Sequence, residues 1–251
     1  MKKKPPISPR KVAPKHFPYK HPTFGTVKTP KPEKYWRETI YYCWWAYLKR
    51  NEQYLEVCRN NGNADSPEMS KVYRDFGDVR SDDFKQWWSE GERGATLFAD
   101  RDTNSLRVLK RDEVDAISSD VLLVGVPMNL PVKYLLERFK QVLDVHHKGE
   151  RGFQYAKQSN ALYRFKGQPN IRGLLTSLKV YDFVKANPRS KQWEVGRILP
   201  QFQMELEECD RKGIEPEFLL KRNIEATVSR HKRKANEYIE NVGRGNFLRG
   251  D

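Results

Sequence analysis

The sequence "EKYWRETIYYCWWAYLKRNEQYLEVCRN", residues 33–60, carries the densest aromatic run of the chain. Within it, apolar side chains recur at steps of three and four residues, the spacing of one helix face: Trp36, Ile40, Trp44, Tyr47, Leu48, Leu55 and Cys58. Tyr41, Tyr42 and Trp45 project off this stripe, so we expect the helix to be covered on more than one side. Gly62 in the following "NNGN" is a natural left-handed terminator. The pattern predicts a buried core helix; a cofactor box or a base-stacking platform is the alternative.

The segment before this helix, residues 1–34, has a different composition. It holds ten lysines and arginines against one acidic residue, Glu33, and eight of the chain's fifteen prolines. Such a composition buries too little apolar surface to offset the entropy of ordering, which predicts a disordered or polyproline-like arm. The candidates for phosphate contacts in this arm are Lys2, Lys3, Lys4, Arg10 and Lys11. The alternative is a solvated tail.

The composition and the apolar patterns of residues 35–150 predict an aromatic-rich α+β domain. Ser81 is placed to cap a helix that turns Phe84, Trp87 and Trp88 inward. The alternating "LRVLK" (residues 106–110) and the continuous apolar "DVLLVGVP" (residues 120–127) predict strands, the second covered on both faces. The "PVKYLLERFKQVL" that follows predicts an amphipathic helix, with an inward stripe of Val132, Leu135, Leu136, Phe139, Val142 and Leu143. Residues 151–170, in which aromatic and basic side chains interleave, are expected to be a linker or a nucleic-acid edge.

Residues 171–251 predict a helical domain with three helices. The first is "IRGLLTSLKVYDFVKAN", and the second is "SKQWEVGRIL", capped by Ser190 and ended by Pro200. The third extends from about residue 224 to 242, and its apolar face consists of Ile224, Val228, Ala235, Ile239 and Val242. The whole chain is therefore expected to be α+β, mainly helical, with a small strand-containing middle region.

This helix order, with Gly196 inside the second helix and a basic third helix, resembles the homeodomain-like helix-turn-helix. In that fold the third helix enters the DNA major groove, and flanking cations contact phosphates. The resemblance implies that Thr227, Ser229, Arg230 and Arg233 face the groove, with Lys232 and Lys234 toward the backbone. One departure is the 23-residue stretch from Pro200 to Arg222, where the family has a turn of three or four residues. Either this stretch is a helical excursion, or "PEFLLKRN" takes the place of the second helix. A basic surface helix without a groove role is the alternative.

The N-terminal half has a second resemblance. "YYCWWAYLKRNEQYLEVC", followed by "DFGDV" and "WW", is similar to Trp-rich regulator-like domains of proteobacterial integrative elements. The resemblance implies a mobile-element setting and no mechanism.

The net charge of +14 and a pI near 9.6 indicate a polyanionic partner, foremost DNA with RNA as the alternative. The three cysteines, Cys43, Cys58 and Cys209, form no CxxC pair, so we expect reduced thiols and no metal site. We also expect neither a cofactor nor a membrane span, and a cytoplasmic location. The aromatic helices are candidates for homodimer or protein contacts.

Three functions are consistent with these features. The first is a non-enzymatic DNA-binding regulator or accessory factor, and the second is an assembly subunit of a nucleoprotein complex without base readout of its own. The third is a nuclease built on the carboxylates Asp112, Glu113, Asp115 and Asp120. Metal-dependent nucleases need clustered carboxylates from more than one motif, and no second matching motif accompanies these four. The sequence therefore favours the first function.

Overall fold

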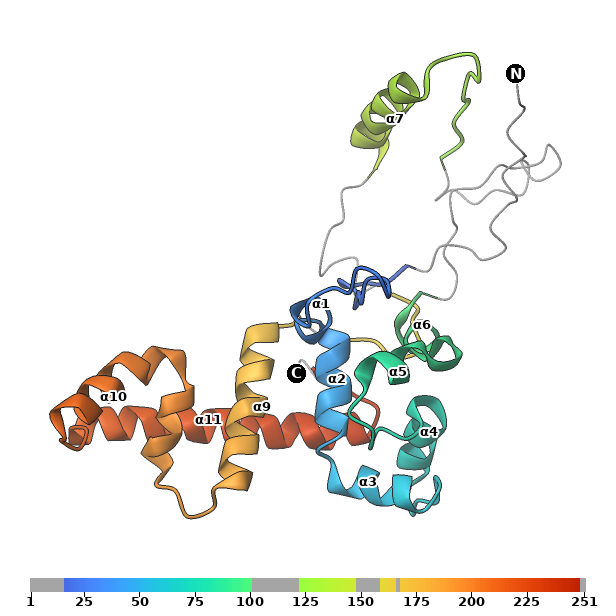
Figure 1. The fold of residues 1–251 in the computed structure, drawn as a ribbon. Helices are drawn as coiled ribbons and strands as arrows, with labels where there is room; N and C mark the ends of the chain where they lie inside the picture. The colour runs from blue at the N-terminus through green and yellow to red at the C-terminus, as the bar shows by residue number, and fades with distance from the viewer. Residues whose placement is uncertain (1–15, 101–121, 148–158, 166–167, 249–251) are drawn as a thin grey trace.

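The computed structural model describes residues 16–100, 122–147, 159–165 and 168–248 (Figure 1). These residues are mainly helical. In chain order the elements are α1 (Lys34–Arg37), α2 (Ile40–Leu48), α3 (Glu52–Arg59), α4 (Pro67–Phe76), α5 (Phe84–Ser89), the 3₁₀ turn η1 (Glu90–Glu92), α6 (Arg93–Phe98), α7 (Val132–His146), α9 (Ile171–Ala186), the 3₁₀ helix η3 (Gln192–Ile198), α10 (Pro200–Lys212) and α11 (Phe218–Gly243).

The single helix expected over residues 33–60 is divided into three, α1, α2 and α3. The breaks fall at two polar residues whose side chains cap the next helix. The Thr39 hydroxyl accepts a hydrogen bond from the backbone N–H of Tyr42 (3.2 Å), and Asn51 Oδ1 accepts one from Tyr54 (2.9 Å). Thr and Asn favour such N-cap positions over helix interiors. The apolar spacing continues across both breaks, which is why it does not reveal them.

The central helix α2 is buried on nearly every side, as the off-stripe aromatics predicted: only Tyr42 of its nine residues is not fully buried. Around it lies a cluster that we call the aromatic core. Its largest fully buried side chains include Tyr41, Trp44, Tyr47, Tyr54, Phe76, Phe84, Phe98 and Phe247. The ring centroids in this core are 4.8 to 6.4 Å apart, within the range of attractive aromatic pairs, in edge-to-face, tilted and stacked arrangements.

Two segments expected to lie outside the core contribute to it. Residues 16–34 were assigned by composition to a disordered arm, yet Phe17, Tyr19 and Phe24 pack against the aromatic core. Residues 159–165 were expected to be linker, yet Ala161, Tyr163 and Phe165 are buried. In both segments a few apolar side chains pack into the core, although the average composition of the segment does not predict a folded structure. Residues 1–15 lie outside the described part.

Helices α4, α5 and α6 cover one side of α2. The expected inward residues Phe84, Trp87 and Trp88 are buried, and the Trp87 indole donates to the Phe76 carbonyl (2.8 Å). The cap of α5 is Asp83 and not Ser81, since Asp83 Oδ1 accepts from the N–H of Gln86 (2.8 Å).

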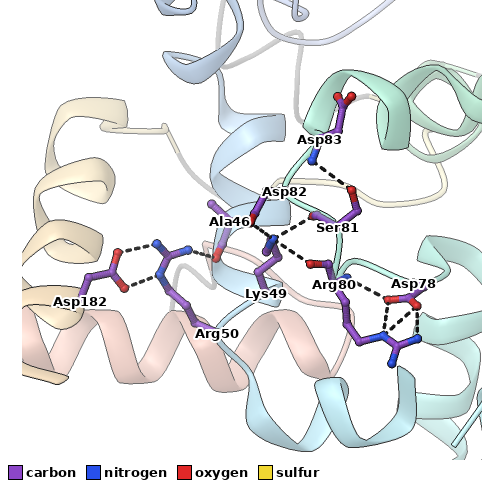
Figure 2. Close-up of polar contacts among 9 residues, drawn as sticks. All are labelled: Ala46, Lys49, Arg50, Asp78, Arg80, Ser81, Asp82, Asp83 and Asp182. Carbon is purple, nitrogen blue, oxygen red and sulfur yellow. Dashed lines mark hydrogen bonds and ion pairs between the residues drawn. The ribbon is translucent and has the colours of Figure 1, made fainter. Parts of the chain in front are cut away.

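A set of polar contacts at the C-terminal end of α2 joins three parts of the fold (Figure 2). Lys49 Nζ donates to the carbonyls of Arg80 (3.2 Å) and Ser81 (2.8 Å) and pairs with Asp82. Arg50 forms a two-pronged ion pair with Asp182 of α9, at 2.6 and 2.5 Å. These contacts fix the 78–83 loop and α9 to α2, so we interpret this set as structural.

The described residues show no strand-containing middle region. The expected strand over residues 106–110 lies outside the described residues, whereas residues 122–127 are described and are exposed and unpaired. A strand covered on both faces needs partner strands and layers, and no described segment supplies them. The helix α7 forms as predicted, but none of its residues is buried, and its stripe residues Val132 and Leu136 are 72% and 65% exposed.

In the C-terminal third, α9, η3, α10 and α11 enclose a second cluster, which we call the C-terminal core: Val180, Trp193, Val195, Leu199, Leu206, Ile224 and Val228. The 23-residue stretch beginning at Pro200 forms α10, a turn at Gly213 and the start of α11, so "PEFLLKRN" is no separate helix. Pro200 begins α10 instead of only ending η3. Gly196 is buried, and η3 packs so closely on α11 there that a Cβ at this position would lie 2.7 Å from Ile224 Cγ2.

Candidate nucleic-acid interface

The long helix α11 is held along one side by both cores. Its first half places Ile224 and Val228 in the C-terminal core, and its second half places Ala235, Ile239 and Val242 in the aromatic core. These are the five positions predicted for its apolar face, and all are buried. Figure 1 shows α11 passing behind α9 and α2 across the body of the molecule.

Two close contacts fix the register of α11 near its C-terminal end. The buried Asn51 side chain donates from Nδ2 to the Ile239 carbonyl of α11 (2.7 Å), while its Oδ1 caps α3. A Cβ at Gly243 would lie 2.4 Å from Asn51 Nδ2, so the contact requires a residue without a side chain. The polar face of α11 is thereby held in one rotational setting.

That polar face carries the cations that the sequence singled out. Arg230, Lys232, Arg233 and Lys234 are exposed, and none forms an ion pair with a carboxylate among the described residues. Two cations nearer the helix ends differ, because Lys221 pairs with Glu215 (2.6 Å) and Arg244 pairs with Glu240 (2.5 Å). The middle of α11 therefore presents positive charge that no described acidic side chain neutralises.

Arg230 and Arg233 share one side of the helix because they are three residues apart. With Ala226 and Ser229 they line a shallow hollow on the side of α11 that faces away from its buried positions. Lys232 projects nearer to the apolar face, at a different angle from the two arginines. The guanidinium groups of Arg230 and Arg233 therefore lie on the outer side of α11, and the ammonium group of Lys232 lies to one side of them.

The two hydroxyl residues predicted to face a groove have different settings. Thr227 is half-buried beside Val228. Ser229 is exposed, but its Oγ accepts a hydrogen bond from Gln192 Nε2 of η3 (2.5 Å), which also donates to the Glu225 carbonyl (3.2 Å). A ligand that bonded Ser229 would compete with Gln192, a residue that the sequence analysis did not identify.

His231 is a second residue that the sequence analysis missed. Its Nδ1 lies 2.9 Å from Oγ of the buried Ser177 on α9, and the ring is half-buried. Burial, and then the neighbouring Lys234 and Arg230, lower the pKa of His231 below its ordinary value. Its place one turn after Thr227, at the border of the apolar face, is the signal by which it could have been found.

The remaining candidate residues lie elsewhere. Lys2, Lys3, Lys4, Arg10 and Lys11 are outside the described residues, as are the carboxylates at 112, 113, 115 and 120. Among the described ranges, no group of three or more His, Cys, Asp or Glu residues is placed to hold a metal ion. Cys43 and Cys58 are free thiols, and burial raises the pKa of both. No described helix combines the length and apolarity needed to span a bilayer.

No family model, curated protein or solved structure matches this chain. The functional interpretation therefore depends on the chemistry of α11 and its surroundings.

Proposed function

We propose that this protein is a non-enzymatic DNA-binding regulator or accessory factor, in keeping with the mobile-element setting that the N-terminal resemblance implies. The observation that carries the proposal is the exposed, unneutralised group of Arg230, Lys232, Arg233 and Lys234 on a helix fixed by two cores. A rigid helix with cations on its outer side suits the DNA major groove, whose width admits an α-helix.

In this proposal Arg230 and Arg233 approach base edges, since a guanidinium can donate two hydrogen bonds to guanine O6 and N7. Lys232 and Lys234 contact phosphates, together with the basic residues at positions 2–4, 10 and 11. Affinity then falls steeply with salt, because about 0.9 counterion is released for each neutralised phosphate. The 3₁₀ helix η3 supports the groove-facing side through the Gln192–Ser229 hydrogen bond.

The test begins with selection of bound sequences from a random duplex pool, with a single-stranded RNA pool in parallel. Affinities of Arg230→Ala, Lys232→Ala and a control, Arg74→Ala on α4, are then measured for the selected and a scrambled duplex. Arg74 is also exposed and helical, so the control matches the lost charge. We expect Arg230→Ala to lose about 1–3 kcal/mol on the selected duplex and less on the scrambled one.

Lys232→Ala should weaken both duplexes alike, and Arg74→Ala neither. Equal losses of Arg230→Ala on both duplexes would exclude base readout by α11. A wild-type protein whose duplex affinity is insensitive to salt would exclude the mechanism altogether.

A second candidate function is that of an assembly subunit without base readout, and α7 favours it. Val132 and Leu136, which share the apolar stripe of α7, are 72% and 65% exposed. An exposed apolar stripe on a 15-residue helix indicates an interaction surface. The occupant that we propose is α7 of a second copy, because one stripe can pair with itself about a two-fold axis.

Light scattering tests this second function. The expected result is a dimer that Leu136→Glu converts to a monomer, while Gln141→Glu, a matched change on an exposed polar position of α7, leaves it intact. A wild-type monomer at all concentrations would exclude it.

A further inference from the structure

The N-terminal segment gathers three lysines over one aromatic ring. The Nζ atoms of Lys20, Lys31 and Lys34 lie 5.6, 5.3 and 5.6 Å from the centroid of the Tyr35 ring. No two of these ammonium groups are then farther apart than about 11 Å, roughly one screening length at moderate salt. Their charges therefore act together on a nearby anion.

The backbone that carries Lys31 is fixed by local hydrogen bonds. A turn over residues 26–29 brings Gly25 and Pro30 into an antiparallel bridge, and Lys31 N donates to the Phe24 carbonyl (2.9 Å). Gly25 has a φ of +76°, and a Cβ there would lie 2.3 Å from the Thr29 carbonyl oxygen. Phe24 anchors this turn on the aromatic core through Trp36 and Phe84.

The positive charge of this group is not neutralised by a described carboxylate. All three lysines are exposed, and none forms an ion pair among the described residues. The acidic residue nearest in sequence, Glu33, pairs instead with Arg37 (2.8 Å). Lys31 Nζ also donates to the Thr23 hydroxyl (3.4 Å), which is neutral. The attraction between the Tyr35 ring and these ammonium groups is weak at an exposed site, so the ring does not neutralise their charge.

We propose that Lys20, Lys31 and Lys34 form a phosphate-binding site on a prefolded part of the N-terminal segment. The ligand is a phosphate of a polyanion, for which three ammonium groups around one ring supply both charge and donors. That the polyanion is DNA rests on the proposed function; that the site takes phosphate does not. None of these lysines is among the residues proposed above for DNA contacts.

The test compares a triple variant, Lys20→Gln, Lys31→Gln and Lys34→Gln, with a control that removes equal charge at Lys71, Lys85 and Lys179. The control lysines are exposed but dispersed over α4, α5 and α9. Circular dichroism confirms that both variants remain folded. Binding of a random-sequence duplex and of inorganic polyphosphate is measured over a series of salt concentrations.

We expect the triple variant, and not the control, to lose affinity for polyphosphate by about tenfold at low salt. Its salt slope on the duplex should fall by between about 0.9 and about 2.7, as one to three phosphate contacts are lost. Polyphosphate binding without duplex binding would support the phosphate site and refute DNA as its source. Equal behaviour of the triple variant and the control, or a wild type that binds neither ligand, would overturn the proposal.

Discussion

The two cores share α9 and α11 but are built from different side chains and from different ranges of the sequence. The aromatic core draws rings from residues 17–54, 73–98, 163–165, 181, 238 and 247. The C-terminal core is mainly aliphatic and is confined to residues 180–228. A large ring can contact side chains from several helices at once, so the rings of this core join segments that are far apart in the sequence. The comparison indicates that the aromatic core brings the N-terminal and C-terminal segments together, whereas the C-terminal core forms from contacts between residues that are close in the sequence.

Truncation of Trp44, in the aromatic core, should lower the free energy of unfolding more than any truncation in the C-terminal core. The ring is fully buried and contacts Phe76, Phe98, Tyr163, Phe165 and Phe247. We expect Trp44→Ala to lower the free energy of unfolding by about 3–5 kcal/mol, measured by urea denaturation. Trp44→Phe should cost less, because it keeps a ring and removes an indole N–H that has no described acceptor. Equal losses in the two variants would contradict the ring-contact explanation.

Truncation in the C-terminal core should cost less. Leu206 is 1% exposed and connects α10 to Ile224 and Val228. We expect Leu206→Ala to lose about 2–3 kcal/mol, near the low end for leucine, because this core is small. Unfolding should remain one transition, since α9 and α11 extend through both cores. Two separate transitions by circular dichroism and tryptophan fluorescence would show instead that the C-terminal core unfolds independently.

Overpacking the C-terminal core tests how tightly η3 meets α11. In Gly196→Ala the added Cβ would lie 2.7 Å from Ile224 Cγ2 and 3.1 Å from Leu206 Cδ1. The expected cost is about 1–3 kcal/mol in thermal or urea unfolding. Gly125→Ala is the matched control, because no described atom lies within 4 Å of the position of its Cβ. If Gly196→Ala left the free energy of unfolding unchanged, η3 would be able to move away from α11 without a loss of stability.

The sequence predicted much of the C-terminal third and less of the rest. The five apolar positions of α11 were correct because a 3.6-residue period continued through a helix covered on one side. The same period gave one helix over residues 33–60, where Thr39 and Asn51 end hydrogen bonding without interrupting the apolar pattern. For α7 the period was correct and the burial was wrong, because an amphipathic pattern does not specify which surface covers it.

Of the candidate site, the sequence could supply the residue types and not their neighbours. Arg230 and Arg233 stand out as basic residues on the polar side of a helix. Gln192 and Ser177 approach α11 from separate elements, through the Gln192–Ser229 and Ser177–His231 hydrogen bonds. No spacing rule relates residues 37 or 54 positions apart. The lysines over Tyr35 were missed for the opposite reason, since a strongly basic composition concealed an ordered turn.

The Arg50–Asp182 ion pair joins α2 of the aromatic core to α9, and its removal should have a modest effect. Its side chains are 27% and 46% exposed, so solvent screens much of the attraction. A double-mutant cycle with Arg50→Met and Asp182→Asn should give a coupling of about 0.5–1 kcal/mol that decreases with added salt. A coupling of zero would assign the attachment of α9 to apolar packing alone.

The smallest effect concerns His231, which lies on α11 where the helix passes from one core to the other. Burial is the first cause that lowers its pKa in the folded protein, so the unfolded chain binds its proton more readily. Stability from this group is therefore present above the unfolded pKa of about 6.5 and is lost as the pH falls through the folded value. We expect the urea midpoint to fall between pH 7.5 and 5.5 in the wild type and to fall less in His231→Gln. The control is His146→Gln on the exposed end of α7.

The carboxylates whose pKa is lowered, such as Glu52 beside Lys185, keep their contribution throughout this window, because that contribution is lost only as the pH falls below about 4.5. Lys234 and Arg230 are further causes of the lowered pKa of His231. A duplex that neutralised both cations would raise that pKa, and binding would then take up protons below about pH 6.5. Calorimetry in two buffers of different ionisation enthalpy measures this uptake, and its absence in a protein that binds DNA would place the duplex away from this part of α11.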